Sequence, residues 1–494
     1  MQVKVITADP LKFVTPALVV GCFEDVDGTD LLERLDRGLN GVLSFLRQQK
    51  EFSGELNKVK ELNTLGQMPA ERVVLVGLGK RRELTAERVR QSAGTASRTL
   101  NQLGVSSCLA TLPQIEGGDR FAGAVVEGMM LGSYRFDVYR TEPKERACLA
   151  ELNLAAETKR EAKAMALASS ESRIICDAVR MARDLVSHPG NHATPAFLAE
   201  QALAIAARQG FACHVLDAKE IENLGMNGLL FVGKGSAQPP RFIIMEYHGR
   251  RQDGKPVVIV GKGITFDSGG ISLKPREGME RMKDDMSGAA AVFGVMKAAA
   301  ALKIPVNLVG LVPAAENMPD GGAYKPGDVV RTMSGKTVEI NNTDAEGRMV
   351  LCDALHYAQR YRPSALIDLA TLTGACLVAL GTEASGLMGN DDGLKRALKK
   401  AGEATGERVW ELPLWDEYGE AMKSDIADLK NAGGPHAGTV TAAWFLRQFV
   451  GKAKWAHLDI AGTAWEEKGR NYLPKGATGV GVRLLVDYLR GIAG

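Results

Sequence analysis

The sequence predicts an α/β protein with more than one domain, and three observations support this prediction. The chain has 494 residues, enough for two or three domains at roughly 100 to 200 residues each. In both halves, strand-like apolar runs alternate with segments of helical spacing, a pattern typical of helices layered on a largely parallel sheet. Between the halves lies a charged, alanine-rich stretch without glycine or proline, which predicts a long connecting helix.

The elements of the first half follow from local composition and periodicity. Strands are expected where β-branched and apolar residues cluster, at Val3 to Thr7, Ala17 to Gly21, Val73 to Gly79 and Ser107 to Leu112. Helices are expected where apolar residues recur at helical spacing, at Leu31 to Leu39, Thr85 to Leu103 and Phe121 to Ser133.

The connecting helix is expected from about Leu152 to Val186. It ends at the segment Ser187 to Pro195, because two prolines and a glycine in that segment cannot continue a helix. The predicted organisation is therefore an N-terminal α/β domain over residues 1–151, a linking helix over residues 152–190 and a C-terminal domain over residues 191–494.

The second half predicts a doubly wound sheet. Buried strands are expected at Phe242 to Tyr247, Val257 to Gly261, Asn307 to Pro313, Ala365 to Ala370 and Trp455 to Ile460. Helices are expected between several of them, as at Ser287 to Leu302 and Arg348 to Tyr361. Because functional groups in such sheets collect at the carboxyl ends of strands, the search for chemistry starts there.

Composition excludes several classes of protein. The formal net charge is +2, so the chain lacks the strong overall positive field of a dedicated nucleic-acid binder. Seven scattered cysteines without a CxxC pair are typical of reduced thiols, not of a disulfide framework. The N-terminal run breaks at Asp9, before a signal-peptide core could form, and the most hydrophobic stretch, Leu369 to Thr382, is too short to span a bilayer. We expect a cytoplasmic protein without a membrane partner.

The first segment that suggests chemistry runs from Gly261 to Pro275, directly after an expected strand. It places Lys262 and Asp267 five positions apart, and Gly269 and Gly270 permit tight backbone geometry around them. Taken alone, the segment fits a glycine-rich turn with a solvated lysine and a capping aspartate equally well.

Two further segments carry paired acids just before helices. Met282 to Gly288 contains tandem aspartates ending in Asp285, although tandem acids at a helix start are usually caps. Asn341 to Arg348 contains Asp344 and Glu346, which point to the same side if the segment is extended. A simple helix cap needs only one of these two acids.

Together the three segments offer four carboxylates, those of Asp267, Asp285, Asp344 and Glu346. Four converging carboxylates repel one another unless cations neutralise them, so a shared site predicts metal. Two divalent ions bridged by carboxylates and a water would lower the pKa of that water toward neutrality. A weaker alternative is phosphate binding at Gly228 to Lys234, which fits a P-loop except that Gly235 replaces the final Ser or Thr.

The motifs carry a family resemblance. Asn342 to Arg348, with the sequence Asn-Thr-Asp-Ala-Glu-Gly-Arg, resembles the signature of the leucine aminopeptidase (cytosol aminopeptidase) family. Val260 to Gly270 is similar to the family's metal-ligand strand, and Met282 to Gly288 is similar to its next ligand segment. The motifs follow the family's order, and the likeness, closest to the bacterial members, is specific from about Ala182 onward. The resemblance implies a macro-like N-terminal α/β domain, a C-terminal doubly wound mixed-sheet catalytic domain and a homohexamer.

The resemblance also implies an activity and a role for each matching residue. The activity is the release of N-terminal residues, preferentially leucine and other apolar ones, from peptides with a free N-terminus by a metal-activated water. The implied ligands of two divalent ions per subunit, Mn²⁺ or Zn²⁺, are Lys262, Asp267, Asp285, Asp344 and Glu346, with Asp267 and Glu346 shared. The implied catalytic pair is Lys274 and Arg348, the latter holding a bicarbonate ion as proton relay. The implied pocket for the first substrate side chain is formed by Met282, Thr371 and Gly374.

Two other functions stay open at this stage. A phosphatase could use the same two-metal chemistry, although its ligand sets are usually rich in histidine and none of the seven histidines falls in the three segments. DNA binding as a second role, known among some bacterial relatives, would use the basic clusters Lys80 to Arg82 and Lys395 to Lys400. Solvated surface faces explain both clusters better than DNA binding does.

Overall fold

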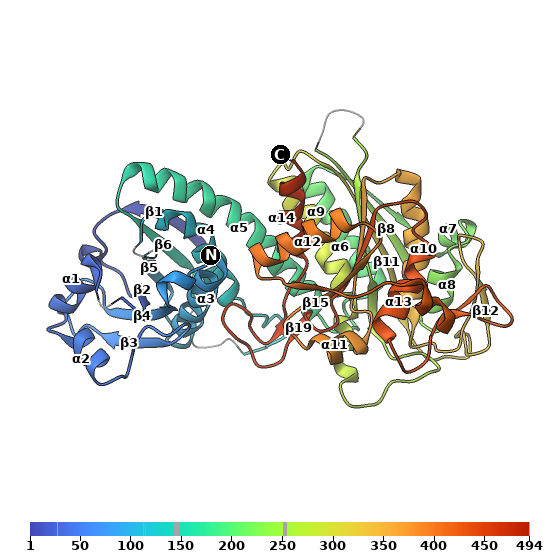
Figure 1. The fold of residues 1–494 in the computed structure, drawn as a ribbon, viewed down its shortest axis with the longest axis horizontal. Coiled ribbons are helices and arrows are strands. Elements are labelled where there is room, and N and C mark those ends of the chain that lie inside the picture. The colour runs from blue at the N-terminus through green and yellow to red at the C-terminus, as the bar shows by residue number, and fades with distance from the viewer. Residues whose placement is uncertain (27, 112, 114, 143–147, 250–253, 494) are drawn as a thin grey trace. The chain divides into compact units, whose positions relative to one another are not determined.

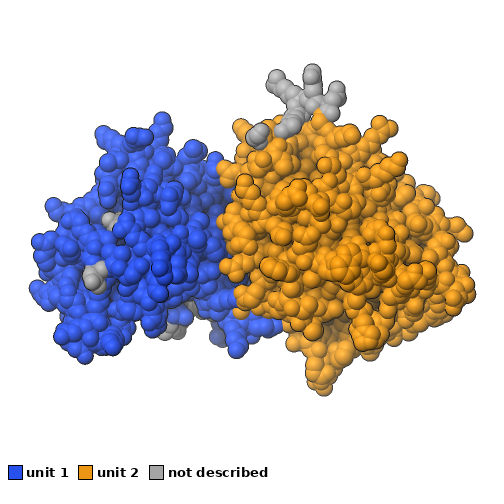
Figure 2. Space-filling view, viewed as in Figure 1, with its two compact units in different colours: residues 1–177, 467–475 blue, residues 178–466, 476–494 orange. Residues whose placement is uncertain are grey.

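The structure is a computed structural model that describes all residues except 27, 112, 114, 143–147, 250–253 and 494 (Figure 1). The chain divides into two compact units (Figure 2). Unit 1 comprises Met1–Asp177 and Glu467–Lys475, and unit 2 comprises Ala178–Glu466 and Gly476–Gly494. The division falls inside a long helix, and Glu467–Lys475, a segment expected in the C-terminal domain, belongs to unit 1.

Unit 1 is a six-stranded sheet with helices packed on it. In spatial order its strands are β1 (Gln2–Thr7), β6 (Glu151–Ala156), β5 (Ser107–Ala110), β2 (Leu18–Phe23), β4 (Arg72–Gly79) and β3 (Val59–Asn63). All neighbours pair in parallel except β3, which pairs antiparallel with β4. The helices are α1 (Asp30–Gly38), α2 (Val42–Gln48), α3 (Ala86–Gln102), α4 (Ala122–Gly132) and α5 (Lys159–Ser187), with short 3₁₀ helices η1 (Pro10–Lys12), η2 (Arg81–Glu83) and η3 (Gly118–Phe121). The predicted strand ending at Leu112 stops at Ala110, and Leu112 lies outside the described residues.

The predicted start of the linking helix is wrong. Residues 151–156 form strand β6, which pairs with β1 on one side and β5 on the other, and α5 begins only at Lys159. Leu152 and Leu154 are fully buried in this position. A short apolar run does not distinguish a strand from a buried helix, and pairing with two neighbouring strands decides the outcome.

Unit 2 is built on a nine-stranded mixed sheet. In spatial order its strands are β16 (Val409–Glu411), β15 (Ser385–Gly389), β18 (Trp455–Asp459), β14 (Ala365–Ala370), β9 (Val257–Gly261), β11 (Asn307–Asn317), β8 (Arg241–His248) and β7 (Ala212–Leu216), while β10 (Gly263–Asp267) pairs with the end of β11. Small sheets are formed by β12 (Val329–Arg331), β13 (Thr337–Glu339) and β17 (Leu429–Lys430), and by β19 (Trp465–Glu466) and β20 (Gly476–Ala477). The central strands β18, β14, β9 and β11 run parallel.

Helices cover both faces of this sheet, as a doubly wound fold requires (Figure 1). One layer contains α6 (Pro195–Gln209), α9 (Ser287–Ala301), α12 (Asp392–Thr405) and α14 (Val482–Ala493). The other contains α8 (Asn227–Gly233), α10 (Glu346–Ala358) and α13 (Gly438–Arg447). The remaining helices are α7 (Ala218–Asn223), α11 (Gly374–Leu380), η4 (Met279–Met286), η5 (Gln359–Tyr361) and η6 (Asp416–Met422). The predicted two-domain α/β fold is confirmed.

The described part of the chain contains no helix with the length and hydropathy needed to cross a membrane.

Two glycines of α4 let it pack closely on α3 in unit 1. A Cβ on Gly128 would lie 2.3 Å from the backbone oxygen of Arg90, and a Cβ on Gly132 would lie 2.6 Å from the backbone oxygen of Gly94. Rotating a side chain cannot relieve a clash with a backbone oxygen. The spacing of these two helices therefore depends on the missing side chains.

We predict that Gly128→Ala lowers the free energy of unfolding of unit 1 by about 1 to 3 kcal/mol, because overpacking outweighs the better helix propensity of alanine. Gly491→Ala in α14 is the control, since no atom lies within 4 Å of its added Cβ. Denaturant unfolding followed by circular dichroism measures both. Equal or greater stability for Gly128→Ala would contradict the packing argument.

Candidate active site

The strand order of unit 2 brings the predicted residues to one edge of the sheet. Lys262 directly follows β9, Asp267 ends β10, and Thr371 directly follows β14. Strands β14, β9 and β11 are parallel neighbours, so their carboxyl ends open on the same side. Residues that are far apart in the sequence thereby share one site.

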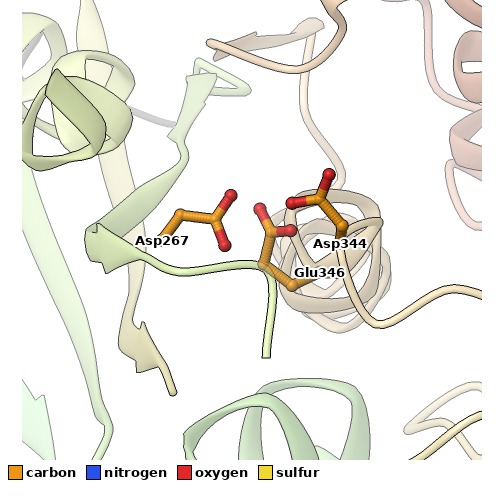
Figure 3. A group of neighbouring side chains, drawn as sticks. All are labelled: Asp267, Asp344 and Glu346. Carbon is orange, nitrogen blue, oxygen red and sulfur yellow. The ribbon is translucent and has the colours of Figure 1, made fainter. Parts of the chain in front are cut away.

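Three of the four predicted carboxylates form a tight group. Asp267 comes from the end of β10 and Glu346 is the first residue of α10, with Asp344 just before that helix. One carboxylate oxygen from each lies within 4.8 Å of the other two. Figure 3 shows these three side chains gathered about one space. The separation of Asp344 and Glu346 by two positions does place both acids at this centre, as the sequence predicts.

The fourth carboxylate joins the group through a lysine. Lys262 Nζ lies 2.7 Å from Asp285 Oδ1 and 2.8 Å from Glu346 Oε1. It also donates a hydrogen bond of 3.0 Å to the backbone oxygen of Thr371. Its side chain is only 3% exposed, so the alternative of a solvated surface lysine is excluded.

Lys274 pairs with the other two carboxylates of the group, those of Asp267 and Asp344. Its Nζ lies 2.8 Å from Asp267 Oδ2 and 2.5 Å from Asp344 Oδ1. Burial disfavours the charged form of both lysines, but the surrounding carboxylates outweigh burial and raise the pKa of Lys262 and of Lys274. Both ammonium groups are therefore protonated in this arrangement.

Negative charge remains in excess at this site. Burial raises the pKa of Asp285, Asp344 and Glu346, and neighbouring carboxylates add to that effect. Two ammonium groups cannot neutralise four carboxylates, and the buried Oε2 of Glu346 has no hydrogen-bond partner among the described residues. An environment that favours a proton on a carboxylate also favours a metal cation. Hard oxygen donors with surplus charge fit divalent ions.

Arg348 lies two residues beyond Glu346 on the first turn of α10. Its Nη1 donates a 2.6 Å hydrogen bond to the backbone oxygen of Asn431. Burial lowers the pKa of Arg348 to about 10, an effect that the carboxylates of Glu346 and Asp459 oppose. The guanidinium thus stays charged at neutral pH and cannot serve as a base.

The three residues expected to form the substrate pocket occupy different elements. Thr371 touches the centre directly, since its Oγ1 donates a 2.7 Å hydrogen bond to Asp285 Oδ1. Met282 is half-buried in η4, three positions before Asp285. Gly374 is exposed at the start of α11, and a Cβ added there would meet no atom within 4 Å.

Sequence reasoning missed the amide and hydroxyl groups that hold the acidic segments in place. Asn317, at the end of β11, donates from Nδ2 to Asp267 Oδ1 at 2.8 Å and to the backbone oxygen of Thr343 at 3.1 Å. Tyr324 donates to the same oxygen of Thr343 at 2.9 Å, and Thr343 Oγ1 donates to the backbone oxygen of Gly269 at 2.7 Å. The position of Asn317 at a strand end was a usable signal, whereas Tyr324 offered none.

Gly347 leaves the space that Lys262 fills. A Cβ at this position would lie 2.6 Å from Cε and 2.7 Å from Nζ of Lys262. The glycine between Glu346 and Arg348 is therefore a steric requirement of the site.

Fold and site together define a class of protein, a two-domain α/β enzyme with a buried carboxylate centre suited to divalent metals. Comparison of the chain with known protein families identifies the family within that class. The chain matches the cytosol aminopeptidase family, N-terminal domain, over residues 19–143 and the catalytic domain of the same family over residues 180–486. This chain belongs to the cytosol aminopeptidase family, and it is a metal-dependent aminopeptidase, a hydrolase.

Individual relatives support the assignment. The probable cytosol aminopeptidase of Geobacter sulfurreducens is 62% identical, and the match covers 99% of each chain. The cytosol aminopeptidase of Pseudomonas aeruginosa is 47% identical over 99% of this chain and 98% of its own length.

Solved structures agree with these matches. A mutant of tomato leucine aminopeptidase superposes with a TM-score of 0.89 at 33% identity, covering 99% of this chain and 96% of its own. The bottromycin maturation enzyme BotP in complex with Mn has a TM-score of 0.86 at 35% identity, covering 97% and 100%.

We predict that Gly347→Ala weakens the affinity for Mn²⁺ about tenfold or more, because the flexible end of Lys262 yields and its Nζ leaves Asp285 and Glu346. Calorimetric titration of metal-free protein with Mn²⁺ measures the affinity. Gly393→Ala is a matched control at the second position of α12, where the nearest atom, Asp391 Oδ1, lies 3.1 Å from the added Cβ. Unchanged affinity in Gly347→Ala would show that the position of Lys262 is not needed.

Proposed function

We propose that this aminopeptidase releases leucine and other apolar residues from the N-termini of peptides, using a water activated by two divalent cations. The observation that carries the proposal is the buried centre of four carboxylates and two lysines at the strand ends, with negative charge left over. The hydrogen bond from Thr371 Oγ1 to Asp285 Oδ1 brings one of the three expected pocket residues to this centre, which supports a substrate site beside it.

The residues that would hold the two cations are Lys262, Asp267, Asp285, Asp344 and Glu346, with Asp267 and Glu346 shared. Lys262 would have to lose its proton to act as a ligand, which a cation nearby favours. When bound, the two cations supply the Lewis acidity that lowers the pKa of a water and polarises the scissile carbonyl. BotP, one of the similar structures, is in complex with Mn, which makes Mn²⁺ the first ion to test and Zn²⁺ the second.

Lys274 is the residue proposed to stabilise the transition state. Attack of water on the scissile carbonyl creates a negatively charged tetrahedral oxygen, and a fixed ammonium next to it lowers the energy of that state. The Lys274 side chain is 21% exposed and that of Lys262 is 3% exposed, so Lys274 carries the more accessible of the two ammonium groups.

Arg348 is proposed to hold a bicarbonate ion. Its Nε is buried and makes no hydrogen bond to any of the described residues, which leaves a donor for an anion. Bicarbonate at this place could take the proton of the attacking water and return it to the leaving amine. The guanidinium itself contributes only charge and hydrogen bonds.

A homohexameric, cytoplasmic enzyme completes the proposal, as the family resemblance implies. Neither alternative function, a two-metal phosphatase or DNA binding, is favoured, because the chain belongs to the cytosol aminopeptidase family. The segment that fits a P-loop, Gly228 to Lys234, lies in helix α8 up to Gly233 and does not form a phosphate-binding loop. In the basic cluster at 395–400, Lys395 pairs with Asp392 and Glu411, and Lys399 pairs with the same glutamate, which weakens its attraction for DNA.

The proposed requirement for a free N-terminus predicts strict exopeptidase behaviour. A leucyl peptide should be cleaved, and its N-acetylated form should be essentially inert because acetylation removes the basicity of the amine. Amidation of the far end should be tolerated. Chromatography of both peptides after incubation with the Mn²⁺-loaded protein gives the answer, and similar cleavage rates for free and acetylated peptides would refute the proposal.

We predict that Lys274→Ala lowers kcat by about 100-fold or more and changes KM much less, since the charge that Lys274 meets develops only in the transition state. Steady-state kinetics on leucyl peptides separates the two parameters. Lys399→Ala, a surface lysine with one ion pair at 3.5 Å, is the control and should behave like the unmodified enzyme. A rise confined to KM in Lys274→Ala would rule out the oxyanion role.

A further inference from the structure

Asn431 is a fully buried amide that the sequence motifs do not include. It directly follows strand β17 and has no exposed surface. Its Oδ1 accepts hydrogen bonds from the backbone N–H groups of Asn341 and Asn342 at 3.0 and 3.2 Å, and its Nδ2 donates to the backbone oxygen of Asn342 at 2.6 Å. One side chain therefore clamps both residues that lead into the acidic segment.

The backbone of Asn431 is engaged as well. Its N–H donates to the backbone oxygen of Glu339 at 2.9 Å, and its own carbonyl oxygen accepts the 2.6 Å bond from Arg348 Nη1. All the polar groups of this residue are thus satisfied within the protein. The same residue that fixes the backbone before Asp344 also fixes the guanidinium after Glu346.

The clamp extends to the carboxylates through Asn342. The Oδ1 of Asn342 accepts the backbone N–H of Asp344 at 2.9 Å, so the residue that Asn431 holds sets the backbone of Asp344 in turn. A reciprocal bond of 3.3 Å runs from the N–H of Ala432 to Asn341 Oδ1. Two segments almost 90 positions apart are locked together here.

We propose that Asn431 is a positioning residue that couples the metal-ligand segment to Arg348. By holding residues 341–342 it orients Asp344 and Glu346, and by accepting from Arg348 it sets the place of the guanidinium relative to those two acids. This inference rests on the proposed function, because Arg348 and the carboxylates act in it together. Both the affinity for metal and the turnover therefore depend on a residue that lies outside the three motifs.

Asn431→Ala and Asn431→Asp test the proposal. The alanine variant removes the three side-chain hydrogen bonds to Asn341 and Asn342 but keeps the backbone carbonyl that accepts from Arg348. The aspartate variant keeps an acceptor for the two N–H groups, loses the donor to Asn342 and adds a buried negative charge. We expect each to weaken the affinity of the metal-free protein for Mn²⁺, measured by calorimetry, by about 10- to 100-fold, the range typical of residues that support metal ligands. In kinetics on leucyl peptides, kcat should fall by a similar factor, with KM less affected.

A double-mutant cycle separates positioning from general stability. If Asn431 acts through Arg348, then Asn431→Ala in an Arg348→Ala background should lower kcat much less than it does alone. Asn390→Ala is the control for the loss of a side chain that holds backbone groups. Asn390 accepts from the N–H of Trp455 at 2.7 Å and donates to the backbone oxygen of Ala453 at 3.0 Å. Both groups lie at or just before the start of β18, the end of that strand opposite to the site. We expect Asn390→Ala to reduce thermal stability and to leave both Mn²⁺ affinity and kcat unchanged.

The outcomes are distinguishable. Three results would each overturn the positioning role and leave the proposed function intact. The first is folded Asn431 variants with normal Mn²⁺ affinity and turnover, and the second is additive losses in the cycle. The third is failure of both Asn431 variants to fold while Asn390→Ala folds. Absence of peptide hydrolysis by the unmodified, Mn²⁺-loaded protein would refute the proposed function instead. In that case the Mn²⁺ titrations alone would still decide whether Asn431 supports the ligands.

Discussion

Mutual repulsion among buried carboxylates is the constraint around which unit 2 is organised. Asp267, Asp285 and Glu346 are each almost fully buried, and Asp344 lies beside them. Removing such groups from water costs several kcal/mol per charge unless cations and hydrogen bonds compensate. Lys262 and Lys274 supply part of the compensation. The remaining negative charge is what makes the centre a site for divalent metal, so the same imbalance that opposes folding provides the chemistry.

Ion pairs and hydrogen bonds compensate for the burial of these charges only when their atoms are held in good geometry. The protein achieves this with small residues and amides around the acids. Gly347 leaves room for the Lys262 amine, while Asn317 ties Asp267 to the backbone of Thr343. Asn431 does the same for the backbone before Asp344 and for Arg348. Side chains fixed in this way need little rearrangement when charge develops, which is the source of electrostatic catalysis.

Local sequence predicted most elements of the fold because their signals are strong. Strand β9 is a continuous apolar run, β14 is apolar except for Asp368, and α9 is an alanine-rich segment of 15 residues. The predictions failed where the signal was weak or shared. Strand β3, at the sheet edge, has three polar residues in five, and α2 is only seven residues long. Strand β6 was taken for the start of a helix, since only its two neighbours in the sheet identify it as a strand.

The sequence by itself determined the ligand types, their order along the chain and the family, because those depend on residue identity and short spacing. Asp344, Glu346 and Arg348 lie within five positions, close enough for a motif to show their relation. Only the tertiary structure decided which lysine meets which acid, since Lys262 and Glu346 are 84 positions apart and meet through the order of strands β14, β9 and β11. Contacts such as that of Asn431 with Arg348 leave no periodic or compositional trace, because a buried amide is recognised only by the backbone groups that surround it.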